Sequence, residues 1–321
     1  MRYAELGESG LKVSRIGVGT AAFGVEPYGI PTPGEDRVDG PGALEMIREA
    51  VAGGVNFFDS APGYGPSESL LGQGLAEHPE CVIATKVPVP DGIESMTRTE
   101  LQRMVDASLE ASRRALRREV LDVVQIHNAT VRVLRDGHLV ECLERARERG
   151  EVRHVGASVY GPEAATAAIR TGRIKVLQLA VSLLDQRMCG GVLAEAERRG
   201  IGVLTRSALL KGALTKRAQW LPESLRQVAE ASARAVKSLG TTWEELPSMA
   251  LRFCLSLNSA HTVLVGIRSS AELRASLAAE AMEPLPSEVL RLAYALALDD
   301  EELLNPSFWH LEESDTEHEP V

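Results

Sequence analysis

The stretch GVNFFDSAPGYG (residues 54–65) says most about the fold, because an apolar run within it ends on Asp59 and Tyr64 follows five residues later. The next two apolar runs end in a similar way, VIATK (82–86) on Lys86 and LDVVQIH (121–127) on His127. Runs that are apolar throughout, rather than alternating, are typical of strands buried on both faces. In a closed parallel barrel the ends of such strands meet at one mouth. We therefore expect these four side chains to lie together.

The same unit, a short apolar run followed by a helix-like segment, recurs along the chain. Eight runs have this form: IGVGT (16–20), VNFFD (55–59), VIATK (82–86), LDVVQIH (121–127), VRHVGAS (152–158), IKVLQLAVS (174–182), IGVLTRS (201–207) and TVLVG (262–266). Helical periodicity lies between them, most clearly over 40–54 and 98–117. Such alternation implies parallel pairing through right-handed crossovers. Eight units in about 250 residues predict an α/β fold of the (β/α)8 TIM-barrel type.

A doubly wound α/β sheet is the alternative architecture for this alternation. It normally carries a tight GxGxxG turn after its first strand, whereas GVGTAAFG (17–24) has a different glycine spacing. Three segments add to the bare repeat. They are a predicted N-terminal β-hairpin over 2–14 that plugs the barrel bottom, a Pro- and Gly-rich loop over 25–40, and extra helices in the C-terminal part, including 208–250.

Composition narrows the class of protein. Hydrophobic content of 44% and charged content of 25% are ordinary for a soluble globular protein. We predict one barrel domain over 1–313 and a polar, disordered tail over 314–321. The net charge of −10 argues against a nucleic-acid partner. No CxxC pair or other metal-ligand spacing occurs, so we expect no metal site. The N-terminus lacks a secretory apolar core and no stretch could span a membrane, so we expect a cytoplasmic protein.

The residue types at the predicted mouth suit proton transfer to a carbonyl oxygen. A free phenol is a weak acid at neutral pH, and an ammonium close to its oxygen stabilises the phenolate. Lys86 supplies that ammonium, and Asp59 is expected to keep it charged and in place. His127 is expected to hydrogen-bond the substrate carbonyl, and Tyr64 is expected to give a proton to the carbonyl oxygen. Each residue alone has a structural explanation, such as a turn or cap for an Asp. Their shared place at successive strand ends favours catalysis.

With these residues in view, the sequence resembles the aldo-keto reductase superfamily, in particular its bacterial, short-loop members. The matching segments are YAELGESGLKVSRIGVGT, GVNFFDSAPGYGPSESLLGQGL, VIATKV, DVVQIHN, VRHVGAS, VLTRSALLKGALT and TVLVGIRSSAEL. The resemblance implies a (β/α)8 barrel that binds NADP(H) or NAD(H) without a Rossmann domain. It places the family's catalytic tetrad on Asp59, Tyr64, Lys86 and His127. The implied function is an NAD(P)H-dependent oxidoreductase that reduces an aldehyde or ketone to an alcohol, or the reverse, with hydride from nicotinamide and the proton from Tyr64.

The resemblance also implies cofactor-binding positions at the nicotinamide end. Ser158 and Gln178 are expected to hold the carboxamide, although the Asn that commonly follows this Ser in the family is Val159 here. Arg206 stands where many members stack a Tyr on the nicotinamide, and a guanidinium plane can also stack on a ring. The floor of the site is expected to come from the backbone of Gly19 and Thr20.

The phosphate end is predicted after the last strand, where Gly266 leads to Arg268 and Ser269 at the start of a helix. A helix N-terminus favours an anion, and a simple N-cap explains the serine but not the arginine. Glu272 stands where reductases that prefer NADPH often have a basic residue. A carboxylate there accepts from a ribose 2′-OH and repels a 2′-phosphate, so we hypothesise that NADH is used at least as well as NADPH. The positions that hold adenine in many members differ here and read Ala275 and Ser276.

The sequence says least about the substrate. The pocket is expected to form from loops 25–40 and 208–222 and from residues 308–310, with Tyr28, Trp220 and Trp309 as candidate lining residues. An aromatic content of 4% favours a small polar or sugar-like carbonyl over a steroid. Two alternatives stay open: a non-catalytic nucleotide-binding regulatory or redox-sensing subunit, and a lyase or aldolase that uses Lys86 as a Schiff base. The oligomeric state is not predicted.

Overall fold

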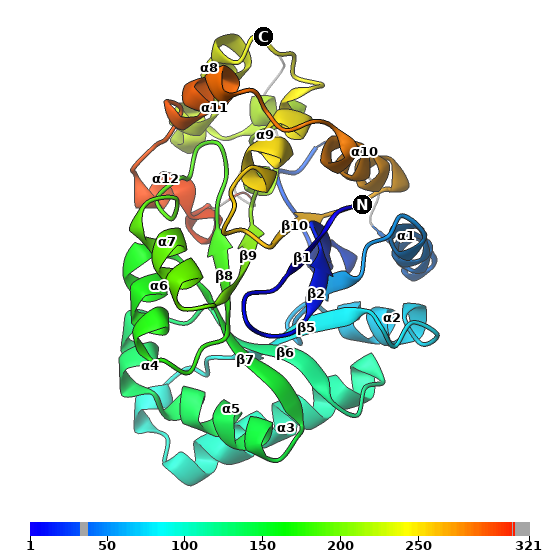
Figure 1. Cartoon of the computed structure of the whole chain (residues 1–321), viewed down its shortest axis with the longest axis vertical. Coiled ribbons are helices and arrows are strands. Elements are labelled where there is room, and N and C mark those ends of the chain that lie inside the picture. Colours follow the sequence, from blue (N-terminus) through cyan, green and yellow to red (C-terminus); the bar gives the residue numbers. More distant parts are fainter. Residues whose placement is uncertain (33–37, 310, 312–321) are drawn as a thin grey trace.

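In the computed structural model, which describes residues 1–32, 38–309 and 311, parallel strands close into a barrel (Figure 1). The strands follow chain order around the barrel and the last pairs with the first: β3 (Ile16–Gly19), β4 (Phe57–Asp59), β5 (Val82–Pro88), β6 (Leu121–His127), β7 (Val152–Val159), β8 (Val176–Ala180), β9 (Gly202–Arg206) and β10 (Thr262–Gly266). Each of the eight predicted runs coincides with one of these strands to within a few residues at either end. The prediction of a (β/α)8 barrel is therefore confirmed.

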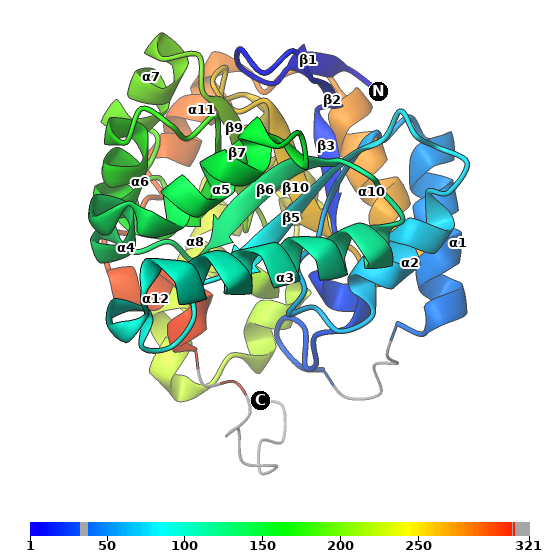
Figure 2. The same cartoon turned by 90° about the horizontal axis from the view of Figure 1, so that it is seen from below.

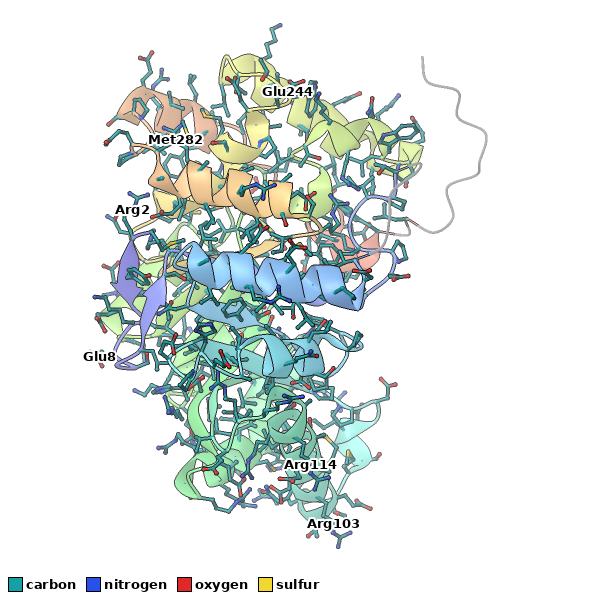
Figure 3. The ribbon with its side chains drawn as sticks, turned by 90° about the vertical axis from the view of Figure 1, so that its right-hand side faces the viewer. Arg2, Glu8, Arg103, Arg114, Glu244 and Met282 are labelled. Carbon is teal, nitrogen blue, oxygen red and sulfur yellow. The ribbon has the colours of Figure 1, made fainter. Side chains whose placement is uncertain are left out.

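Helices form an outer layer around the barrel (Figure 2). They are α1 (Gly40–Ala52), α2 (Ser67–Gly74), α3 (Arg98–Leu116), α4 (Val131–Asp136), α5 (His138–Glu148), α6 (Gly161–Arg170), α7 (Gly191–Arg198), α8 (Arg226–Ser238), α9 (Leu246–Leu255), α10 (Ser270–Ala281), α11 (Ser287–Tyr294) and α12 (Glu301–Leu304). Short 3-10 turns are η1 (Ala21–Phe23), η2 (Ile93–Ser95), η3 (Leu210–Gly212), η4 (Lys216–Trp220), η5 (Glu223–Leu225) and η6 (Pro306–Phe308). Figure 3 shows α1 lying between α10 and α2 on one side of the barrel. The extra C-terminal helices were correctly predicted.

Helix α3 illustrates how local sequence sets this outer layer. The Thr97 hydroxyl accepts a hydrogen bond from the Glu100 amide at 3.2 Å, and the Glu100 carboxylate accepts one from the Thr97 amide at 2.8 Å. This capping box satisfies backbone donors that the first helical turn leaves without partners. Leu101, Val105 and Leu109, spaced four residues apart, are buried and give the helix one apolar face toward the barrel.

Inside the barrel, alternate residues of each strand point inward, and they form two layers of opposite character. The lower layer, nearer the amino ends of the strands, is an apolar cluster separate from the main core: Phe57, Val82, Ala84, Val123, Val176, Leu204 and Leu264, together with Leu6 and Val13 from the N-terminal segment. The upper layer, one inward position further along most strands, contains the polar residues described below. The apolar layer closes the barrel to water from beneath, so the chemistry is restricted to the upper mouth.

The N-terminal segment plugs the barrel bottom, as predicted. Strands β1 (Tyr3–Glu5) and β2 (Lys12–Ser14) pair antiparallel and lie across one end of the barrel (Figure 2). Leu6 is fully buried against Gly202, where a Cβ atom would come within 2.6 Å of the Leu6 side chain. Glycine at this position is therefore needed for Leu6 to enter the barrel. The Glu8 amide donates to the Gly200 carbonyl at 2.8 Å and fixes the hairpin in place.

Some predicted features lie outside the described residues. These are residues 33–37 of the long loop, His310 and the tail over 314–321. Within the described ranges, no helix combines the length and the apolar character needed to cross a membrane.

Candidate active site

A buried ion pair lies at the centre of the upper layer. The Lys86 ammonium donates to Asp59 Oδ2 at 2.6 Å and to the Ser60 carbonyl at 2.7 Å. Lys86 is 1% exposed and Asp59 5% exposed. Both groups lie at the ends of adjacent strands, because Asp59 ends β4 and Lys86 lies near the end of β5. The two opposite charges can be buried together because their mutual attraction offsets the cost of removing each from water.

Two amide side chains hold the other oxygen of the same carboxylate. Gln125 Nε2 donates to Asp59 Oδ1 at 3.0 Å, and Gln178 Nε2 donates to it at 2.7 Å. Both carboxylate oxygens of Asp59 therefore accept hydrogen bonds: Oδ2 from the Lys86 ammonium and Oδ1 from the two amides. Sequence reasoning missed Gln125. Its position two residues before His127 on β6 is the signal that could have found it, because residues two apart on a strand share a face.

Tyr64 and His127 lie beside the ion pair. The Lys86 ammonium is 5.0 Å from the centroid of the Tyr64 ring, and the Tyr64 and His127 rings meet edge to face at 5.8 Å. The loop that carries Tyr64 is fixed by a side chain, since Ser67 Oγ donates to the Tyr64 carbonyl at 2.7 Å. The structure thus brings together all four residues that the sequence placed at the mouth.

The chain turns sharply after His127. Asn128 has φ of +54°, in the left-handed region that asparagine tolerates better than most residues. The Ala129 amide then donates to the Ser158 carbonyl at 2.8 Å. This connection anchors the loop after β6 to the neighbouring strand β7.

The pKa values of Lys86 and His127 are shifted in opposite directions. Burial lowers the pKa of the Lys86 ammonium, but its interactions with Asp59 and Tyr64 outweigh burial and raise that pKa overall. Lys86 is therefore charged at neutral pH. Burial, and then the positive charge of Lys86, lower the pKa of His127 to about 4. The imidazole is therefore neutral at neutral pH, when it can donate a hydrogen bond but does not act as a cationic acid.

The positions expected at the nicotinamide end lie on neighbouring strands. Gly19 and Gly266 are directly paired at the ends of β3 and β10, so bare backbone faces the mouth there. Ser158 Oγ donates to Gln178 Oε1 at 3.2 Å, which joins the two predicted carboxamide partners. The Thr20 hydroxyl donates to the Asp59 carbonyl at 3.1 Å. Thr20 therefore supports Asp59 in this structure.

Arg206, at the end of β9, stacks on Tyr160. The guanidinium carbon is 4.0 Å from the Tyr160 ring centroid, and its nitrogens donate to the Val159 carbonyl and the Ser207 hydroxyl, both at 3.3 Å. The Val159 side chain itself packs into the main core outside the barrel. Sequence reasoning missed Tyr160, and no pattern in the sequence predicts this stack.

At the predicted phosphate end, the Glu272 carboxylate pairs with the groups that were expected to bind a phosphate. Glu272 Oε2 accepts from the Arg268 amide at 2.8 Å, and Glu272 Oε1 accepts from the Arg268 guanidinium at 2.6 Å. Ser269 is the N-cap of α10, and its hydroxyl accepts from the Glu272 amide at 3.2 Å. Ser276 is buried and donates to the Glu272 carbonyl, whereas Ala275 is exposed.

Tyr28 lies between the two ends of this path. A Cβ atom on Gly266 would come within 2.0 Å of the Tyr28 hydroxyl, so the phenol rests on the glycine backbone. The Ile30 amide donates to the Lys211 carbonyl at 3.0 Å, which ties this loop to the loop after β9. Burial raises the pKa of Tyr28 to about 12. Tyr28 was expected at the substrate pocket, and it lies on the expected cofactor path.

Comparison with known proteins identifies the family. The family model described as "Aldo/keto reductase family" matches residues 15–296. This chain belongs to the aldo/keto reductase family. It is therefore an oxidoreductase of a family that acts on carbonyl compounds, and the resemblance found in the sequence is confirmed.

Relatives of this aldo-keto reductase have low sequence identity to it, but the alignments span most of both chains. L-galactose dehydrogenase of Arabidopsis thaliana is 26% identical over 291 residues, which are 85% of this chain and 86% of that protein. The NADH-specific methylglyoxal reductase of Escherichia coli (strain K12) is 23% identical over 309 residues, 87% of this chain and 93% of that protein. The solved structure of aldo-keto reductase AKR11C1 from Bacillus halodurans, in its holo form, has a TM-score of 0.76 at 23% identity, with 95% of this chain and 100% of that chain covered. This structural likeness shows a shared fold.

The aromatic residues proposed for the substrate side of the enzyme are mostly packed. Trp309 is 7% exposed, and its indole N–H donates to the Leu303 carbonyl at 3.1 Å. Trp220 ends η4 and packs partly buried against the main core. Phe308 is exposed. The described residues therefore give no wide aromatic wall for a flat ligand.

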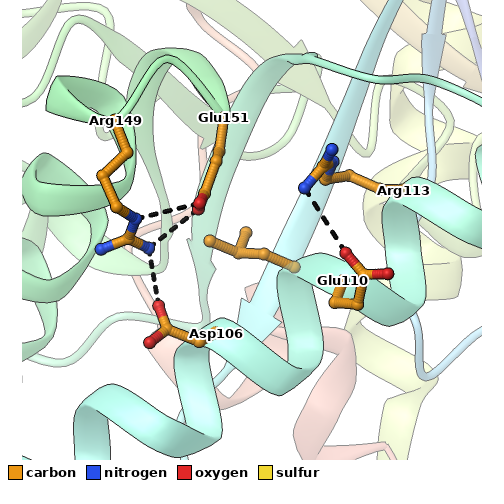
Figure 4. A pocket seen from close by; sticks show the side chains of 6 residues that line it. Asp106, Glu110, Arg113, Arg149 and Glu151 are labelled. Carbon is orange, nitrogen blue, oxygen red and sulfur yellow. Dashed lines mark hydrogen bonds and ion pairs between the residues drawn. The ribbon is translucent and has the colours of Figure 1, made fainter.

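Two cavities of the enzyme are lined by residues outside the tetrad. One, of about 290 Å³, lies beside α3 and the turn before β7 (Figure 4). Its charged groups pair with one another, since Arg149 binds Asp106 and Glu151 while Arg113 binds Glu110. The second, of about 330 Å³, lies beside η4 and α8 and includes Trp243. Neither contains the groups that carbonyl chemistry needs. Among the described residues, no cluster of three His, Cys, Asp or Glu side chains could hold a metal ion.

Proposed function

We propose that the protein is an NAD(P)H-dependent carbonyl reductase in which Tyr64 is the proton donor. The observation that carries this proposal is the buried, charged Lys86–Asp59 pair beside the Tyr64 ring, with a neutral His127 in edge-to-face contact with that ring. A charged ammonium close to a phenol stabilises the negative charge that the oxygen gains as its proton leaves. A positioned acid of this kind contributes about 10²–10⁴-fold in rate.

The residues present fit a dinucleotide. Ser158 and Gln178 offer a hydroxyl and an amide to a carboxamide, Gly19 leaves backbone room at the end of β3, and Arg268 lies at the N-terminus of α10. When bound, a reduced nicotinamide supplies hydride to the carbonyl carbon. Tyr64 gives its proton to the carbonyl oxygen, so the product is an alcohol. The neutral imidazole of His127 donates a hydrogen bond to the same oxygen and orients it.

The lyase or aldolase alternative requires a neutral Lys86. A Schiff base forms from an uncharged amine. Asp59 at 2.6 Å and the raised pKa of Lys86 keep the amine protonated, which argues against this alternative. The non-catalytic regulatory subunit keeps one argument in its favour, because Tyr28 and Glu272 already lie on the cofactor path. Carbonyl turnover separates that alternative from the reductase.

We propose a small polar or sugar-like carbonyl compound as the substrate. Support comes from the scarcity of aromatic residues and from the packed state of Trp309. The names of two relatives, L-galactose dehydrogenase and methylglyoxal reductase, agree with this class. A direct test is turnover of a short 2-oxoaldehyde, an aldose and a bulky aromatic ketone, followed by loss of reduced-nicotinamide absorbance. Faster turnover of the aromatic ketone than of both polar compounds contradicts the proposed substrate class, and no turnover of any of them favours the regulatory alternative.

For the cofactor, we propose that NADH binds at least as tightly as NADPH. The Glu272 carboxylate occupies the Arg268 amide and guanidinium, so a 2′-phosphate meets a paired cation and a negative charge. Fluorescence titration with both nucleotides tests this in wild type, Glu272→Arg and the matched neutral variant Glu272→Gln. Glu272→Arg is expected to tighten NADPH binding about tenfold, with a smaller gain in Glu272→Gln. Wild-type binding of NADPH far tighter than of NADH is the contrary result.

A further inference from the structure

Arg206 differs from the other charged residues of the mouth in its partners. Asp59 and Lys86 neutralise each other, and so do Arg268 and Glu272. In the described part of the chain, the contacts of Arg206 are the Tyr160 ring, one carbonyl and one hydroxyl, and none is a carboxylate. Arg206 therefore places a positive charge at the end of β9 that contacts no carboxylate among the described residues.

Tyr160 fixes where this charge lies. Its ring lies under the guanidinium at 4.0 Å, and the two hydrogen bonds of Arg206, at 3.3 Å, are long. The ring and these two hydrogen bonds together restrain the guanidinium. The positive charge also reaches the tetrad, because it contributes to the lowered pKa of His127, after burial and Lys86.

Strand geometry brings a nicotinamide ring to this charge, and this step rests on the proposed function. Ser158 and Gln178 are register partners on β7 and β8, and Arg206 ends the next strand, β9, opposite Ala180. A carboxamide held by the first two places its attached ring over the third. A guanidinium plane with one face on Tyr160 has its other face available to a second ring.

The two redox forms of the cofactor differ in charge at this ring. The reduced nicotinamide ring is neutral, whereas the oxidised ring carries one positive charge. We propose that Arg206, held by Tyr160, selects the reduced dinucleotide over the oxidised one by repelling the oxidised ring. Arg206 is then a specificity residue for cofactor redox state, and it favours binding in the direction of carbonyl reduction. Because the mouth is partly exposed to water, we expect a selectivity of about tenfold from this charge.

The test measures affinity and does not depend on turnover. Isothermal titration gives the Kd for NADH and for NAD⁺ with wild type and three variants: Arg206→Gln removes the charge, Arg206→Lys keeps it without the plane, and Tyr160→Phe keeps the ring. The ratio Kd(NAD⁺)/Kd(NADH) is expected to fall about tenfold in Arg206→Gln. It is expected to stay within about twofold of wild type in Tyr160→Phe and to be largely retained in Arg206→Lys. The wild-type ratio is expected to shrink as NaCl rises, which needs no variant.

The outcomes separate this inference from the proposed function. If both nucleotides bind and Arg206→Gln leaves the ratio unchanged, the charge selects nothing and the inference is wrong, while the reductase proposal stands. A wild-type ratio independent of NaCl overturns the inference in the same way, even if the glutamine variant fails to fold. If neither nucleotide binds wild type, the proposed function fails and the inference fails with it.

Discussion

The lower and upper layers inside this barrel come from the same strands and yet have opposite chemistry. A step of two residues along a strand moves from the apolar layer to the polar one: Phe57 to Asp59, Ala84 to Lys86, Val123 to Gln125, Val176 to Gln178, and Leu204 to Arg206. The lower layer has a hairpin beneath it, whereas the upper layer lies toward the carboxyl ends of the strands. The difference teaches that position along the strand, rather than the strand itself, decides whether a residue stabilises the fold or takes part in the site.

If the two layers are independent, substitutions in the lower one change stability and leave the chemistry intact. Phe57→Ala gives the largest expected effect. Phe57 is fully buried at the centre of the lower cluster, and its removal is expected to cost about 3–5 kcal/mol in the free energy of unfolding. Urea denaturation measures the loss, and kcat of the folded fraction is expected to stay within about threefold of wild type. A collapse of kcat in folded Phe57→Ala contradicts the separation of layers.

Lys86→Met tests whether the upper layer also affects stability. Removing the ammonium leaves a buried carboxylate with only the amides of Gln125 and Gln178 and the Thr20-anchored backbone around it. We expect a loss of about 3 kcal/mol in unfolding free energy, because an unpaired buried charge is costly. The double variant Asp59→Asn/Lys86→Met is the control, and it is expected to recover part of that loss. A double variant less stable than Lys86→Met shows that the pair is not the cause.

The hairpin is a smaller test of the lower layer. Leu6→Ala is expected to lower the free energy of unfolding by about 2–3 kcal/mol, since Leu6 fills the barrel bottom against Gly202. Leu11, which is only partly buried against the same cluster, is the matched position, and Leu11→Ala is expected to cost less. Equal losses in the two variants mean that the hairpin is not a specific plug.

The pH dependence of His127 gives the smallest effect. Its folded pKa of about 4 lies below the usual 6.5, so the unfolded state binds the proton more readily. The contribution of the neutral imidazole to stability is full above pH 6.5 and is lost as the pH falls toward 4. His127→Gln is therefore expected to lose less stability than wild type between pH 6.5 and pH 5, by about 1–2 kcal/mol. Identical pH profiles contradict a buried neutral imidazole. His154 and His261, whose pKa values burial also lowers, are present in both proteins and cancel.

The sequence predicted the fold well because apolar runs and helix periods are local signals. VNFFD and VIATK show both their strand character and the ionisable residues that end them, so the meeting of Asp59 with Lys86 followed from topology. The contacts of long or loop-borne side chains did not follow. Glu272 pairs with Arg268 only four residues away, which is a local contact that the sequence spacing could have indicated. Nothing local indicates that Arg206 stacks on Tyr160 or that the Tyr28 phenol rests on Gly266. These contacts depend on distant segments that meet only in the folded chain.

The central claim is that the upper layer carries the chemistry and that Tyr64 supplies the proton. The most direct measurement is kcat for a small carbonyl substrate in wild type and Tyr64→Phe, with the Kd for NADH and the urea midpoint measured on the same samples. We predict that Tyr64→Phe lowers kcat by about 10²–10⁴-fold and leaves the Kd and the midpoint unchanged. A kcat within about threefold of wild type, with the protein folded and NADH bound, contradicts the account.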